Sequence, residues 1–255
     1  MILTVAHQKG GTGKSTLATN LAVELGAELL DLDKQHSSII FNCKRIRDGL
    51  PAISCYSIAE SQCQFDYQQP VPEAHLPELF AWFKQKPGHL VVDVGGFDSP
   101  LNRKALFFAD YILTPCAPSA VEIYGLQMFE EILEKAEEIA DLHLVSHVVI
   151  NNADTRSTKR IGDMQAYIHG KPNHFKLCQT IIGSRIAFKT AYEQGRSVSE
   201  LLARRSDPPN FRLISPGVMS ELLEESKSAK LKRKYQRSAE EINSLVHEIT
   251  SDWEG

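Results

Sequence analysis

Short apolar runs recur along the first two thirds of the chain, and most of them end in polar or glycine-rich residues. Six segments have the length and apolar character of buried strands: 1–6, 29–33, 89–96, 111–115, 147–150 and 175–182. Segments with helical spacing lie between them, beginning with Leu17, Leu21 and Leu25. Strands that alternate with amphipathic helices are typical of a mostly parallel, twisted sheet with helices on both faces. The pattern therefore predicts an α/β fold.

Other parts of the chain give weaker or more peripheral signals. Helical spacing also predicts helices at 121–139, 156–169 and 218–237. Residues 42–88 contain several prolines, and we expect them to form two peripheral elements that cover the sheet. Near the C-terminus, one apolar stripe that should dock on the body of the protein or on a partner helix is formed by Ile242, Leu245, Val246 and Ile249.

Length and composition favour one large globular domain with a tail. The 255 residues are 42% hydrophobic and 24% charged, as in ordinary soluble proteins. We expect a domain at 1–203, with a linker and C-terminal helices packed on it at 204–255. No apolar run approaches the roughly 20 residues of a membrane span, and the N-terminus is typical of a strand rather than a signal peptide, so we expect a cytoplasmic protein. The five cysteines form no C-x-x-C pair, which disfavours zinc and thiol redox sites.

A glycine-rich segment between the first strand and the first helix has the composition of a phosphate-binding loop. Its glycines permit positive φ, so successive backbone N–H groups can turn toward phosphate oxygens, and the helix N-terminus adds partial positive charge. Lys14 can reach the β- and γ-phosphates, the Ser15 hydroxyl can ligate Mg²⁺, and Thr16 can bind an α-phosphate oxygen. The residues predicted to hold the phosphates of a nucleotide are Lys9, Gly10, Gly11, Thr12, Gly13, Lys14, Ser15 and Thr16.

A second lysine distinguishes this loop from the usual G-x-x-x-x-G-K-[ST] pattern. Gln8 stands where the first glycine belongs, and Lys9 precedes Lys14 by five residues. In this the chain resembles the deviant Walker-A ATPases, which include the ParA partition proteins, MinD and the nitrogenase iron protein. The resemblance implies a P-loop NTPase fold and an ATP-dependent sandwich dimer in which Lys9 acts catalytically on the partner's nucleotide. A solvated surface lysine is the alternative. His7, where the family commonly has asparagine, is interpreted as a packing residue.

Three aspartates are predicted at the carboxyl ends of parallel strands, where such sheets bind ligands. Residues 31–35 match the family segment D-x-D-P-Q, except that Lys34 replaces the proline. The resemblance assigns Asp33 to orienting the attacking water, Asp31 to assisting Mg²⁺, and Asp93 to a Mg²⁺-bound water. Each aspartate could instead be structural, as the cap of a turn or a buried hydrogen-bond acceptor.

Two asparagines, Asn151 and Asn152, follow the strand predicted at 147–150. In the resembled family an asparagine at this place binds adenine, so one of the two is a candidate for base recognition, although asparagine also suits turns for local reasons. A weaker pattern, similar to that of partition ATPases in particular, is formed by Arg185, Ala191, Gly195, Ser197 and Val198.

The net charge of −4 conceals an asymmetric distribution. Residues 1–155 carry −9, residues 156–237 carry +10, and residues 238–255 carry −5. Basic residues gathered on one surface bind DNA phosphates of any sequence, although a basic run can also be a solvated helix face. The acidic C-terminus disfavours a membrane-binding tail. The candidates for DNA binding are Arg185, Lys189, Lys230, Lys232, Arg233 and Lys234.

The resemblance and the basic region together predict a DNA-segregation ATPase with weak basal activity. In this interpretation ATP and Mg²⁺ close a homodimer that binds non-specific DNA of the nucleoid, and hydrolysis stimulated by a ParB-like partner releases it. Two alternatives are a membrane-associated positioning ATPase similar to MinD, and an ATP-binding regulatory or scaffold protein with little hydrolysis.

Overall fold

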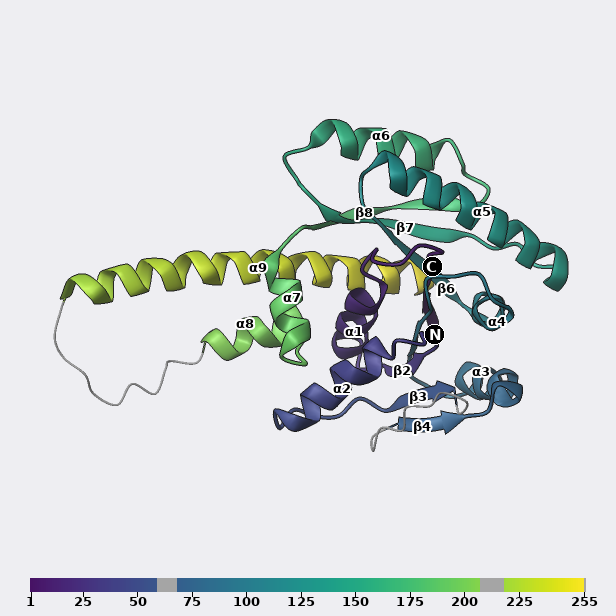
Figure 1. The fold of residues 1–255 in the computed structure, drawn as a ribbon, viewed down its shortest axis with the longest axis horizontal. Coiled ribbons are helices and arrows are strands. Elements are labelled where there is room, and N and C mark those ends of the chain that lie inside the picture. Colours follow the sequence, from purple (N-terminus) through teal and green to yellow (C-terminus); the bar gives the residue numbers. More distant parts are fainter. Residues whose placement is uncertain (59–67, 207–217, 255) are drawn as a thin grey trace.

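A single eight-stranded sheet forms the centre of the protein, which a computed structural model describes for residues 1–58, 68–206 and 218–254 (Figure 1). Its order is β4-β3-β2-β5-β1-β6-β7-β8, and every neighbouring pair is parallel. The predicted α/β architecture is therefore confirmed. The strands are β1 (Ile2–Val5), β2 (Glu28–Asp31), β3 (Cys55–Ile58), β4 (Gln68–Val71), β5 (Leu90–Asp93), β6 (Tyr111–Cys116), β7 (Ser146–Ala153) and β8 (Phe175–Gly183).

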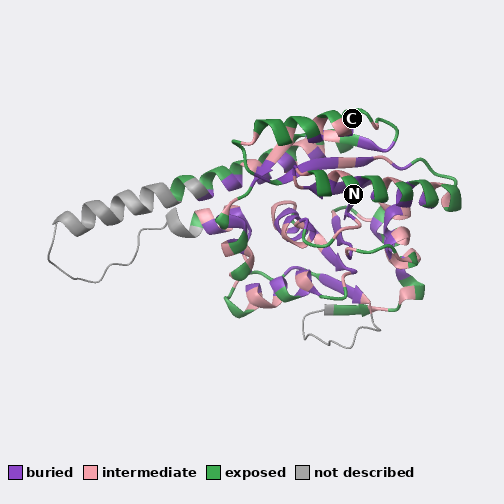
Figure 2. Cartoon of the chain, turned by 45° about the horizontal axis from the view of Figure 1, so that its top comes forward, coloured by how far each residue is buried: buried purple, intermediate pink, exposed green. Residues whose placement is uncertain are grey.

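Helices cover both faces of the sheet and enclose two hydrophobic cores. One face packs against α1 (Lys14–Glu24), α2 (Ser37–Arg47), α7 (Ile186–Glu193), α8 (Val198–Ser206) and α9 (Val218–Glu254). The other packs against α3 (Leu76–Gln85), α4 (Pro100–Phe108), α5 (Ala120–Ala140) and α6 (Thr158–His169), and a short 3-10 helix, η1 (Glu73–His75), precedes α3. Figure 2 shows the buried residues concentrated on the strands and on the inner sides of the helices.

The strands supply both cores because neighbouring side chains point to opposite faces of a sheet. In β1, Leu3 and Val5 belong to the core under α1, whereas Ile2 belongs to the core under α4 and α5. The register pairs Val5 with Asp93 across β1 and β5, and Asp31 with Asp93 across β2 and β5. The carboxyl ends of the three central strands therefore lie at one edge of the sheet.

The expectation for residues 42–88 was wrong. These residues do not merely cover the sheet, because β3 and β4 extend it by two parallel strands beyond β2. Pro70 lies in β4, where its missing N–H is tolerated because β4 is an edge strand. Each strand has only four residues, too few for a clear alternating pattern.

The C-terminal region forms one helix, α9, that continues through both predicted segments to Glu254. The predicted apolar stripe docks on the body of the protein, since Ile242, Leu245 and Ile249 are fully buried in the same core as α1. The linker predicted at 206–210 lies almost wholly outside the described residues. Among the described helices, none combines the length and the apolar character that crossing a membrane requires.

Candidate nucleotide site

The phosphate loop lies at the carboxyl end of β1 and leads directly into α1, which begins at Lys14. Gly11 and Gly13 have φ of 78° and 94°, in the region that favours glycine. At Gly13 a Cβ would also overlap the side-chain amide of Asn151, so both the backbone conformation and the packing require glycine. The sequence-based interpretation of these glycines as loop formers therefore fits the geometry.

The loop after β5 approaches the phosphate loop closely. A Cβ on Gly96 would lie 2.9 Å from the backbone nitrogen of Gly10 and 3.1 Å from the carbonyl carbon of Lys9. Asn102 of α4 fixes this segment by donating hydrogen bonds to the carbonyls of Gly95 and Phe97. A change in the conformation of residues 95–97 would therefore displace the backbone of the phosphate loop.

Two adjoining cavities open on the loop. The larger has a volume of about 550 Å³ and is lined by the loop residues 10–16, except Thr12, and by Asp33, Lys34, Gln35, Ser37, Gly96, Phe97 and Tyr192. The smaller, of about 280 Å³, shares Gly11, Gly13, Thr16 and Tyr192 with the first and adds Asn151, Asn152, Gly183, Arg185, Phe188 and Lys189. Both cavities open beside the phosphate loop and the N-terminus of α1, where the helix favours an anionic group.

The two loop lysines are held by different partners. Lys14 is 5% exposed and its Nζ donates a 2.8 Å hydrogen bond to the carbonyl of Lys9. Burial lowers the pKa of Lys14, and the nearby carboxylates of Asp93 and Asp33 oppose that shift. The ammonium of Lys9 forms an ion pair with Glu122 of α5, and Lys9 lines neither cavity. Lys14 thus lies in the site, whereas the Lys9 side chain is directed away from it.

Asp31 fixes the start of α2. Its Oδ2 accepts hydrogen bonds from the backbone N–H groups of Ser38 and Ile39, at 3.0 and 3.1 Å, and its Oδ1 accepts from that of Asp33. Burial, followed by the neighbouring Asp93, raises the pKa of Asp31 well above its usual value. These contacts match the alternative of a structural cap, and they engage both oxygens of the residue predicted to assist Mg²⁺.

Asp93 differs because one of its buried oxygens has no hydrogen-bond partner among the described residues. Its Oδ2 accepts a 2.6 Å hydrogen bond from the Ser38 hydroxyl, but Oδ1 is buried and has no hydrogen-bond partner among the described residues. Burial raises the pKa of Asp93 to about 6, although the hydroxyls of Ser38 and Ser15 oppose the shift. An unsatisfied carboxylate oxygen beside the Ser15 hydroxyl fits a hard cation such as Mg²⁺.

Asp33 lies at the edge of the larger cavity with its carboxylate half-exposed. Its Oδ1 accepts a 3.0 Å hydrogen bond from the backbone N–H of Gln35. The neighbouring Lys34, which replaces the family's proline, places its ammonium 5.4 Å from the centre of the Phe97 ring. The segment therefore contacts the loop after β5 across the cavity.

The structure separates the two asparagines. Asn151 is 7% exposed and donates a 2.7 Å hydrogen bond from Nδ2 to the carbonyl of Thr12, so its amide supports the phosphate loop. Asn152 is exposed, has a positive φ of 52°, and lines the smaller cavity. Asn152 is therefore the better placed of the two for contact with a base, and its backbone also fits the turn interpretation.

The four predicted DNA-binding residues whose side chains the structure describes are divided between the segment after β8 and the helix α9. Arg185 is engaged in a bidentate ion pair with Glu241 of α9, whose carboxylate also accepts a hydrogen bond from the N–H of Gly183. Lys189 is exposed but borders the smaller cavity. Lys232 and Arg233 are exposed on α9. The side chains of Lys230 and Lys234 lie outside the described part of the structure.

Several residues of the site had no signal in the sequence analysis. Ser38 joins two carboxylates, because its N–H binds Asp31 and its hydroxyl binds Asp93. Tyr192 lines both cavities and donates a 2.7 Å hydrogen bond to the carbonyl of Ser37. Glu122 is buried and holds Lys9. In the sequence, the one signal for Glu122 is an acidic residue in the first turn of a predicted helix.

Comparison with known proteins places this site in a family. The family model described as ATPase MipZ matches residues 1–168. The chain is 27% identical over 214 residues to the maintenance of carboxysome distribution protein A of Halothiobacillus neapolitanus, covering 79% of this chain and 88% of that protein. It is 24% identical over 215 residues to protein ParA of Rhizobium radiobacter, covering 81% and 88%.

A solved structure shares the fold. The ATP complex of a McdA variant from Cyanothece superposes with a TM-score of 0.56 at 21% identity, covering 78% of this chain and 89% of that chain. The MipZ match spans the phosphate loop and Asp33, which line the larger cavity, and also the buried Asp31 and Asp93. On this basis the chain belongs to the MipZ family of ATPases.

Proposed function

We propose that this protein is a partition or positioning ATPase that closes into a homodimer around ATP and Mg²⁺, binds non-specific DNA in that state, and is released by slow hydrolysis that a ParB-like partner stimulates. The observation that carries the proposal is the phosphate loop with two differently directed lysines. Lys14 lies in its own cavity, whereas the Lys9 side chain is directed out of it. A lysine outside its own site is suited to act on a second subunit.

The residues of the site support a defined division of roles. Backbone N–H groups of residues 10–16 bind the phosphates, and Lys14 neutralises the negative charge that develops on them. Ser15 and the free Oδ1 of Asp93 would hold Mg²⁺, which supplies charge neutralisation at the phosphates when bound. Asp33, half-exposed at the edge of the cavity, orients the attacking water. Asn152 contacts the base.

The DNA-binding part of the proposal is supported by charge rather than by a cluster of side chains. Residues 156–237 carry +10, and Lys232 and Arg233 project from an exposed face of α9. Glu241 of the same helix is paired with Arg185, which borders the smaller cavity. This ion pair therefore joins the helix that carries the exposed cations to the border of the smaller cavity.

Variants of the loop test the nucleotide chemistry. Lys14→Ala should abolish ATP binding in isothermal titration calorimetry, because the buried cation of the cavity is lost. Lys9→Ala should retain binding but lose dimerisation and hydrolysis, and Asp33→Ala should trap the ATP-bound dimer. Lys159→Ala, an exposed residue of α6, is the matched control and should change none of these. ATP binding that survives in Lys14→Ala would refute the assignment of the site.

A gel-shift series with ATP, ADP and no nucleotide tests DNA binding. Retardation should need ATP and should be lost when Lys232 and Arg233 are both changed to Glu. The matched double reversal at Lys159 and Arg160, which are exposed on α6, should leave it intact. If both reversals leave DNA affinity and its salt dependence unchanged, the DNA surface lies elsewhere.

Two alternatives predict other results in the same samples. A membrane-positioning ATPase would float with anionic liposomes in the presence of ATP. A regulatory or scaffold protein would dimerise without retarding DNA and would show almost no phosphate release. The substitution of Lys34 for the family's proline is the observation that keeps the second alternative in view, because Lys34 contacts Phe97 rather than stiffening the turn.

A further inference from the structure

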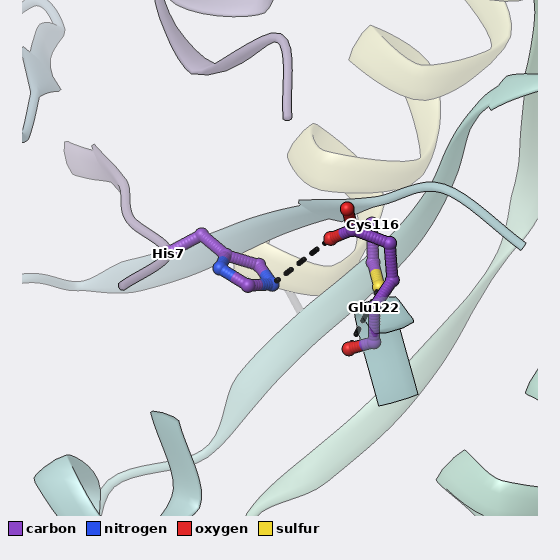
Figure 3. Close-up of side chains that lie close together, drawn as sticks. All are labelled: His7, Cys116 and Glu122. Carbon is purple, nitrogen blue, oxygen red and sulfur yellow. Dashed lines mark hydrogen bonds and ion pairs between the residues drawn. The ribbon is translucent and has the colours of Figure 1, made fainter. Parts of the chain in front are cut away.

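Outside the cavity, three buried polar side chains come together from the segment after β1, the end of β6 and the first turn of α5. Figure 3 shows His7, Cys116 and Glu122 directed toward one another. The Nε2 of His7 lies 4.0 Å from the Oε2 of Glu122, and both atoms are buried without a hydrogen-bond partner among the described residues. On its other oxygen, Oε1, Glu122 receives the ammonium of Lys9.

A metal ion is one explanation for this group, because a nitrogen, a sulfur and a carboxylate oxygen lie within 4.8 Å of one another. The hydrogen bonding of His7 argues against it. Its Nδ1 accepts a 2.9 Å hydrogen bond from the backbone N–H of Lys9, so the neutral ring carries its proton on Nε2 and has no lone pair there. Burial also raises the pKa of the Cys116 thiol, which disfavours the thiolate that metals bind.

The group is better described as the surroundings of one buried carboxylate. Burial, with the nearby Lys14 and Lys9, lowers the pKa of His7 to about 3, so the imidazole is neutral and cannot balance a negative charge. Within the described part of the chain, the charged partner of Glu122 is therefore Lys9. Gly125 permits this arrangement, because a Cβ there would lie 3.0 Å from Cε1 of His7 and 3.7 Å from Cδ of Lys9.

We propose that Glu122 retains Lys9 within its own subunit and must release it before the triphosphate of the second subunit can take it, so that Glu122 limits how readily the ATP-dependent dimer forms. This inference rests on the proposed function, in which Lys9 crosses the dimer interface. Releasing the Lys9 ammonium costs free energy, because it leaves the buried carboxylate of Glu122 beside a neutral histidine. Glu122 therefore competes with the phosphates for one ammonium group.

The test compares dimerisation of Glu122→Gln with that of the wild type. Glutamine keeps the size of the side chain but gives up the charge that holds Lys9. The Lys9 side chain is 37% exposed, and ion pairs of this kind contribute up to about a five-fold factor each. Since two such pairs are released when the dimer forms, the dissociation constant of the dimer should fall by up to about 25-fold.

The measurement is sedimentation equilibrium of the full chain with Mg²⁺ and a non-hydrolysable ATP analogue. Glu131→Gln is the matched control, because Glu131 is an exposed carboxylate of the same helix, and it should leave the dissociation constant unchanged. In a Lys9→Ala background, where the dimer is lost, Glu122→Gln should not restore dimerisation, whereas an effect of Glu122 that does not depend on Lys9 would restore part of it. If Glu122→Gln does not fold, Glu122→Asp should also tighten the dimer, because its shorter side chain weakens the pair.

Two failures can be told apart. A wild-type dimer that depends on Lys9, but is unchanged or weakened by Glu122→Gln, would overturn this inference and leave the proposed function standing. It would mean that Glu122 orients Lys9 instead of competing for it. Binding of the analogue without any dimer that depends on Lys9 would overturn the proposed function, and this inference with it.

Discussion

Replacing Asp93 by Asn should stabilise the nucleotide-free protein at neutral pH. Burial raises the pKa of Asp93 from 3.8 to about 6, so the ionised carboxylate destabilises the folded protein at pH 7.5. A difference of this size corresponds to about 3 kcal/mol. Asparagine retains an oxygen that can accept the hydrogen bond of Ser38 but carries no charge, so the melting temperature should rise by about 6–12 °C.

The pH dependence gives this prediction its sign. Between pH 3.8 and about 6 the folded wild type holds a proton that the unfolded chain has released, so the contribution of Asp93 to stability falls as the pH rises through this window. Above about pH 6, the destabilisation caused by the ionised carboxylate no longer changes with pH. Asp93→Asn has no carboxylate at this position and does not lose this part of its free energy of unfolding. The difference in stability between the variant and the wild type should therefore grow from pH 4 to pH 6.5 and then level off.

Thermal melts of both proteins between pH 4 and 8 provide the measurement, with and without Mg²⁺ and ATP. Mg²⁺ and ATP should stabilise the wild type, because a cation relieves the ionised Asp93, and should stabilise Asp93→Asn much less. Asp163→Asn removes an exposed carboxylate of α6 and serves as the control. A variant that is less stable than the wild type by the same amount at every pH would refute the reasoning and assign Asp93 a purely structural role.

Three further changes have definite expectations. Gly13→Ala should abolish ATP binding in calorimetry, because φ of 94° is strained for alanine and its Cβ overlaps the amide of Asn151. Arg45→Met should cost about 2–4 kcal/mol in urea unfolding, since it strands the partly buried Glu200, and the added change Glu200→Leu should recover most of the loss. Glu241→Gln should cost about 1–2 kcal/mol in the same assay, because it weakens the bidentate pair that joins α9 to the segment after β8.

The phosphate loop and the strand-end aspartates could be predicted because their signals are local. The glycines of the loop and the apolar runs before Asp31 and Asp93 are each read within a few residues. Because the strands are parallel, their carboxyl ends lie at the same edge of the sheet, and this does not depend on the conformation of the connecting segments. For this reason most of the predicted phosphate-loop residues and Asp33 line the larger cavity, whereas Asp31 and Asp93 lie buried at the neighbouring strand ends.

The supporting contacts could not be predicted, because they join residues far apart in sequence. The bond from Ser38 to Asp93 spans 55 positions and that from Asn151 to Thr12 spans 139. Both depend on strand register and on the placement of α2 and β7, which no short pattern specifies. The strands β3 and β4 were missed for a related reason, since four-residue strands at an edge are formed by pairing rather than by their own propensity.

The bond between Lys14 and the carbonyl of Lys9 links the two cations of the loop. Both lysines have partners within the chain: the Lys14 ammonium donates a 2.8 Å hydrogen bond to this carbonyl, and the Lys9 ammonium forms an ion pair with Glu122. A triphosphate in the cavity attracts Lys14, and the carbonyl it leaves belongs to the residue whose side chain Glu122 holds. The N–H of the same residue is bonded to His7 at 2.9 Å, so the peptide groups on both sides of Lys9 carry part of the restraint. Under the proposed function we therefore expect nucleotide binding in one subunit to loosen the backbone that carries Lys9, and so to couple occupation of the cavity to release of the second lysine.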